Sequence, residues 1–115
     1  MKIVIDQYNR EVAQLESLAE LDSLVAERFG LPLRPYSTDL RAAFELAIWA
    51  LENPDIDFPH FEVFRSGYAA PSEPFLASFE VDAWDTGQTA PIAICKSALR
   101  YLKQIAVNLP ELSGH

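Results

Sequence analysis

The stretch Thr89-Ala-Pro-Ile-Ala-Ile-Cys-Lys-Ser-Ala-Leu-Arg-Tyr-Leu102 has the pattern of a well-capped α-helix. Thr89 can accept a hydrogen bond from an amide of the first turn. Pro91 is tolerated there because the first amides of a helix have no intrahelical acceptor. We expect this helix to continue to Asn108-Leu-Pro110. Its predicted buried stripe follows helical spacing: Ile92, Cys95, Leu99, Leu102 and Ala106.

A second helix is predicted near the N-terminus, over Leu18 to Phe29. The sequence Ser17-Leu-Ala-Glu20 is a capping box, in which the hydroxyl and the carboxylate each satisfy a free backbone amide. Gly30 follows the last apolar residue, where a left-handed C-cap is favoured, and Pro32 prevents continuation.

A third helix is predicted to begin after Pro35-Tyr-Ser-Thr-Asp39 and to end at Asn53-Pro54. Ser37 or Thr38 can cap it, and Asp39 would lie in its first turn, where the helix dipole favours a negative charge. The expected core stripe has helical spacing, and Leu46, Trp49 and Ala50 widen the apolar surface beyond it. The stripe consists of Leu40, Ala43, Phe44, Ala47, Ile48 and Leu51.

Three segments have the composition of β-strands: Lys2–Asp6, Phe61–Arg65 and Phe75–Ala83. In the last of these, one face is wholly apolar and the other is mixed, so we expect a sheet covered mainly on one side. Residues 7–16 are ambiguous, because Val12 and Leu15 suit a helix whereas Tyr8-Asn9-Arg10 suits a hairpin turn. Asp85-Thr-Gly-Gln88 is expected to be a turn.

These elements predict an α+β fold, in which a small antiparallel sheet packs between or against three helices. The 115 residues are enough for a single domain with one core. We expect residues 1–16 to form an N-terminal strand or arm, residues 17–106 to form the core, and residues 107–115 to form a tail.

Composition narrows the class of protein. Half of the residues are apolar, so disorder is not expected, yet the apolar runs are too short to cross a membrane. The single Cys95 excludes an internal disulfide framework and favours a cytoplasmic location. A net charge of −8 disfavours general nucleic-acid binding, and it could steer the chain towards a basic partner.

Three segments together resemble the phage "ABA sandwich" domain family of small bacteriophage and prophage proteins. They are Pro35-Tyr-Ser-Thr-Asp-Leu-Arg-Ala-Ala, the predicted hairpin Phe61–Ala83, and Thr89-Ala-Pro-Ile-Ala-Ile-Cys-Lys-Ser-Ala-Leu. The resemblance covers about residues 17–103. It implies a helix–sheet–helix layered fold, a phage or prophage origin and a place in the host bacterial cell. It implies no catalytic residues.

The sequence has no motif for a catalytic, metal or cofactor site. His60 and His115 lack companion ligands, so no metal site is predicted. Cys95 falls on the expected apolar stripe, which predicts a buried structural thiol. The carboxylate pairs Asp55/Asp57 and Asp82/Asp85 fall in turns, where Asp commonly bonds its own backbone. We therefore predict a non-enzymatic protein.

The basic residues Lys96, Arg100 and Lys103 recur at helical spacing and would form one positive stripe, with Tyr101 beside it. One interpretation is a solvated face that pairs with neighbouring acids. The other is a small pocket for a nucleotide-like anion or a site for an acidic partner.

Trp49, Tyr68 and Trp84 lie outside the expected core stripes, and Tyr68 falls in the long connection Ser66–Pro74. Aromatic residues in such places are enriched at protein interfaces, although Trp49 could instead cover the edge of the core. These residues predict that the chain binds a host protein. The narrowest form of this prediction is inhibition of a host defence system. A homodimer that buries the second face of the sheet is a further expectation.

Overall fold

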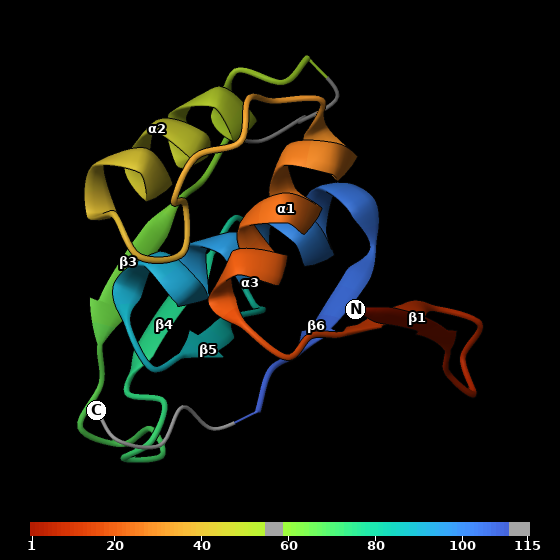
Figure 1. The fold of residues 1–115 in the computed structure, drawn as a ribbon. Helices are drawn as coiled ribbons and strands as arrows, with labels where there is room; N and C mark the ends of the chain where they lie inside the picture. The colour runs from red at the N-terminus through yellow and green to blue at the C-terminus, as the bar shows by residue number, and fades with distance from the viewer. Residues whose placement is uncertain (55–58, 111–115) are drawn as a thin grey trace.

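The computed structural model describes residues 1–54 and 59–110 and has the predicted α+β class (Figure 1). Helices pack against two small three-stranded sheets, where the sequence predicted a single sheet. The helices are α1 (Leu18–Phe29), α2 (Leu40–Leu51) and α3 (Ala90–Lys103). The strands are β1 (Lys2–Ile5), β2 (Glu11–Gln14), β3 (Glu62–Arg65), β4 (Phe75–Ser78), β5 (Asp85–Gly87) and β6 (Ile105–Asn108).

The N-terminal segment forms a hairpin, which resolves the ambiguity at residues 7–16. The Asp6 carboxylate accepts hydrogen bonds from the amides of Tyr8 and Arg10, at 2.8 and 2.9 Å. Asn9 adopts the left-handed conformation that Asn tolerates in turns. Strand β2 then pairs antiparallel with β1 and parallel with β6, so the first and last strands of the chain share one sheet.

Helix α1 has the predicted bounds and caps. The Ser17 hydroxyl accepts from the amide of Glu20, whose carboxylate accepts from the amide of Glu16. Gly30 closes the helix at a φ of 65°. The connector that follows is held to α1, because the Ser37 amide donates to Asp22 and the Ser37 hydroxyl donates to the carbonyl of Leu18.

Helix α2 begins as predicted but presents another face to the core. Asp39 is its N-cap, in place of Ser37 or Thr38, and accepts from the amide of Arg41. The expected stripe is wrong in part, because Leu40, Phe44 and Ile48 are 48%, 38% and 55% exposed. The buried residues are smaller on average: Ala42, Ala43, Leu46, Ala47 and Ala50. These small side chains let α2 approach α3 closely.

Strand β4 is shorter than predicted and ends at Ser78. The Ser78 hydroxyl accepts from the amide of Glu80 and lies against the carbonyls of Glu80 and Ala83, which fixes a tight turn. Val81, expected in the apolar face, is therefore exposed in this turn. The segment predicted as a turn supplies β5, which pairs antiparallel with β4.

Helix α3 also ends earlier than predicted, at Lys103. Gln104 adopts the left-handed conformation, and its amide donates to the carbonyl of Arg100. Residues 105–108 then extend as β6, so Ala106 lies in a strand and two residues of the expected tail join a sheet. The apolar run Ile105-Ala-Val107 suits a strand as well as a helix.

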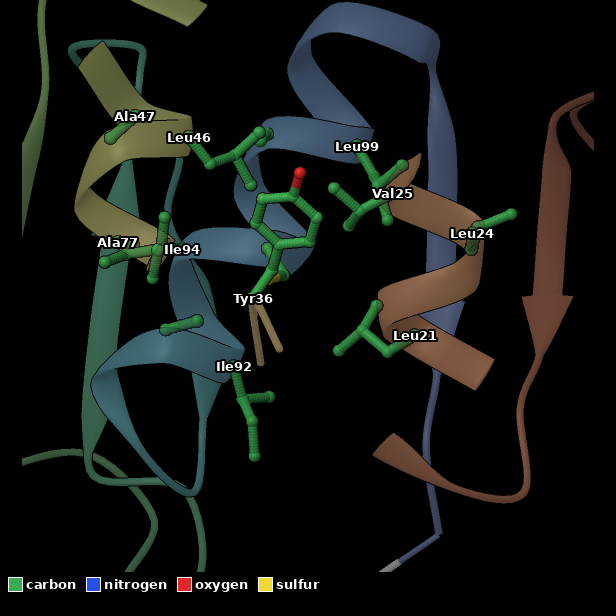
Figure 2. Close-up of a cluster of buried hydrophobic side chains, with 14 of the residues drawn as sticks. Leu21, Leu24, Val25, Tyr36, Leu46, Ala47, Ala77, Ile92, Ile94 and Leu99 are labelled. Atoms are coloured by element: carbon green, nitrogen blue, oxygen red, sulfur yellow. The ribbon is translucent and has the colours of Figure 1, made fainter. Parts of the chain in front are cut away.

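The core lies where α1 and α2 meet α3. Tyr36, in the connector between α1 and α2, lies between Val25 of α1 and Leu46 of α2 (Figure 2). Its side chain is buried, and its hydroxyl donates to the carbonyl of Pro32 at 2.6 Å. Cys95 and Leu99 of α3 complete this cluster without contact with solvent.

Candidate functional site

The positive stripe on α3 is largely neutralised by carboxylates, as one interpretation of the sequence predicted. Arg100 donates to Asp85 of β5 at 2.7 Å and to Glu80 at 2.9 Å. Burial opposes the charged form of Arg100, yet these two carboxylates outweigh burial and raise the pKa of the guanidinium. Arg100 therefore joins α3 to the sheet and offers little charge to a ligand.

Lys96 has a carboxylate partner too, because its ammonium lies 3.4 Å from Glu73. Both residues line a pocket of about 150 Å³ between α3, the β3–β4 connection and the segment after β6. Ser72 and Gln88 add polar groups to its wall. Pockets for drug-sized ligands span about 300–1,000 Å³, so this one suits at most a small ion or part of a larger ligand.

Three of the predicted site residues meet in a second depression, of about 240 Å³. Trp49, Tyr101 and Lys103 all line it, although they come from two helices. The Trp49 ring lies 5.2 Å from that of Phe29, so Trp49 covers the edge of the core. The Tyr101 ring is parallel to that of Phe79, at 6.2 Å. Both aromatic rings therefore have structural contacts.

Helix α3 packs on one face of the sheet formed by β3, β4 and β5, and no other helix of residues 1–54 and 59–110 contacts this sheet. Gly87 of β5 lies against the first turn of α3, which identifies the inner face. Because side chains alternate along a strand, the register places the other set on the outer face. This outer sheet face comprises Glu62, Phe64, Leu76, Ser78, Trp84 and Thr86.

Aromatic side chains are exposed on the outer sheet face. Phe64 is 42% exposed and Trp84 is 43% exposed, while Leu76 is half-buried. The Trp84 indole donates to Glu62 at 2.6 Å, which fixes the ring against the sheet. Tyr68 is fully exposed in the connection between β3 and β4. The strand register thus places Trp84 on the same face as Phe64, a residue that the sequence did not single out.

Among the described residues, those weighed for catalysis or metal binding do not gather into one cluster. Within residues 1–54 and 59–110, no group of three or more His, Cys, Asp or Glu could hold a metal ion. Cys95 is buried, and burial raises the pKa of its thiol, which removes the reactive thiolate. Asp85 is paired with Arg100. Asp55, Asp57 and His115 lie outside the described residues.

Comparison with known proteins adds no identification, since the sequence matches no protein-family model, no curated protein and no solved structure. The resemblance to the phage domain family therefore stays a hypothesis based on its three segments. No helix in the described part of the chain has the length and hydrophobicity required to cross a bilayer.

Proposed function

We propose that this chain is a non-enzymatic binding protein that contacts another protein through the outer sheet face. The observation that carries the proposal is the exposed pair Phe64 and Trp84, with Leu76 between their strands. Exposed aromatic groups on a rigid sheet give large contact areas at a low entropic cost, and such residues dominate interface energies. Tyr68 is a further exposed aromatic residue, in the connection between β3 and β4.

A host protein as partner is the narrower form of this proposal. It is supported by the small size of the chain, by its net charge of −8 and by its resemblance to a phage family. The charge favours a basic partner surface and opposes nucleic acid. This narrower proposal includes inhibition of a host defence system and a cytoplasmic location.

Capture from bacterial lysates tests the proposal. The immobilised protein should retain a partner, and the variant Phe64→Ala/Trp84→Ala should lose most of it, because interface aromatics commonly contribute 2 kcal/mol or more. Val81→Ala is the matched control, since Val81 is also exposed but lies in the β4–β5 turn. Equal retention by all three proteins, or no retained protein from any lysate, would contradict the proposal.

Sequestration of a nucleotide-like anion is the alternative, and it rests on Lys96 in its 150 Å³ pocket. This alternative is weakened by the carboxylates that pair with Arg100 and Lys96, because they already neutralise both cations. A ligand at 100 times its dissociation constant stabilises a protein by about 2.7 kcal/mol. Thermal melting in the presence of each nucleotide of a panel therefore tests this alternative. An unchanged melting temperature with every nucleotide would exclude this alternative.

A further inference from the structure

Helix α2 carries an apolar ridge that the described residues leave partly exposed. Leu40, Phe44 and Ile48 recur every four residues and form this α2 ridge, beside the small side chains that pack on α3. Three large apolar side chains in one row are more than the scattered exposed residues of a typical surface. Contact with a partner would therefore bury these apolar side chains.

Strand β3 lies at one edge of its sheet, next to β4. The Ser66 amide donates to the carbonyl of Pro74, so residues 62, 64 and 66 direct their backbone groups towards β4. The intervening Val63 and Arg65 must then direct their N–H and C=O groups away from β4. No strand among the described residues pairs with that edge. An edge of this kind is a template for a further strand.

Helix α2 and strand β3 lie on the same side of the molecule. Figure 1 shows α2 and β3 together along one side, with α3, β4 and β5 further in. The Phe44 ring meets that of Phe61, immediately before β3, at a centroid distance of 6.0 Å. We call the ridge together with Glu62–Arg65 the α2–β3 face.

The charges around this face favour a second copy of the chain over a basic partner. The charged residues on α2, at its two caps, on β3 and in contact with α2 are Arg34, Arg41, Arg65, Asp39, Glu45, Glu52 and Glu62. Their charges sum to −1, whereas the whole chain carries −8. Two identical copies therefore meet here with less repulsion than elsewhere on the surface.

We propose that the α2–β3 face is a homodimer interface, in which β3 pairs antiparallel with β3 of a second copy and the two α2 ridges pack together. A two-fold axis perpendicular to the sheet beside Phe64 sets Val63 opposite the partner's Arg65, and these residues can exchange four hydrogen bonds across the two strands. The same axis makes the α2 helices antiparallel.

This dimer would join the two sheets into one sheet of six strands. Both outer faces would lie on one side of it, with the two Phe64 side chains adjacent at the centre. The sequence suggested a homodimer that buries the second face of the sheet, whereas the dimer proposed here forms at the edge of the sheet and leaves the outer sheet face free. The inference does not depend on the partner-binding proposal, because self-association is measured with the purified chain alone.

Sedimentation velocity over a concentration series tests the dimer. The face is formed by one three-turn helix and one four-residue strand, which is small for a stable interface, so we expect a dissociation constant of about 100 µM. The mass should rise from 12.9 kDa towards twice that value between about 10 µM and 1 mM.

Two variants separate the helix contact from the strand contact. Ile48→Glu places a charge within the ridge, and Arg65→Pro removes an outward N–H, a change that an edge strand tolerates. Each should weaken the dimer at least about tenfold, whereas Val81→Glu should leave it unchanged. A monomer mass at 1 mM, or a dimer that both variants leave intact, would overturn the inference.

Discussion

Gly87 of β5 lies close against the first turn of α3, and replacing it with Ala should destabilise the protein. A Cβ atom at this position would lie 2.6 Å from the amide nitrogen of Ala93 and 2.9 Å from the carbonyl oxygen of Thr89. Attractive contact begins at about 3.5 Å, so α3 or β5 must move by about 0.9 Å. Both neighbours are backbone atoms of a capped first turn, which leaves no side chain that could rotate away.

Overpacking of this kind costs about 1–3 kcal/mol. For a chain of this length that corresponds to a melting temperature about 4–12 °C lower. Urea unfolding followed by circular dichroism measures the free energy directly. Gly67→Ala is the matched control, because an added Cβ there meets nothing within 4 Å and its φ is not in the left-handed region. Equal stability of the two variants would refute the packing of α3 on β5.

Three other variants or treatments test further parts of the structure. Gln104→Gly should stabilise the protein by about 0.5–1 kcal/mol in urea unfolding, because Gln104 ends α3 in a left-handed conformation; a loss of stability would contradict this. Cys95 should react with a thiol reagent only after denaturant is added, since its thiol is buried; rapid labelling of the native protein would place it at the surface. The Glu16 amide and the N-terminal ammonium lower the pKa of Glu20, so the stability that Glu20 contributes is present above its ordinary pKa of 4.5 and lost as the pH falls through the lower folded value. Glu20→Gln should therefore show a smaller loss of stability between pH 5 and about pH 3 than the wild type, and an unchanged acid dependence would exclude this role.

The features set by local backbone chemistry could be predicted from the sequence. The capping box at Ser17 and the left-handed Gly30 defined α1 to the residue, and Thr89 defined the start of α3. Such signals involve neighbours within one helical turn, so they are independent of the tertiary fold. Cys95 was placed in the core for a related reason, since Ile92 and Leu99 fix the direction of its side chain.

Features that depend on distant partners could not be predicted in the same way. Helix α2 is apolar on two sides, and Ala43 and Ala47 fitted either orientation, so the pattern did not show that Phe44 would face outwards. The α3 sequence continues into Ile105-Ala-Val107 without a Gly or Pro. Pairing with β2, about 90 residues earlier in the chain, decides that these residues form a strand.

The candidate site shows the same difference between local features and features that depend on distant partners. The sequence suggested that Lys96 and Arg100 could pair with acids, but it could not identify Glu73, Glu80 and Asp85, which lie in other elements. The sequence singled out Trp84 because it lies outside the expected core stripes. Phe64 was not singled out, because only the register of β3 against β4 places it on the same face as Trp84.

Amide hydrogen exchange along β3 tests most directly whether this side of the molecule is an interface. Glu62 and Phe64 bond to β4, so their amides should be protected at every protein concentration. The amides of Val63 and Arg65 should exchange rapidly at about 10 µM and become protected at about 1 mM, as β3 pairs with its copy. Rapid exchange of Val63 and Arg65 at both concentrations would contradict the proposed interface.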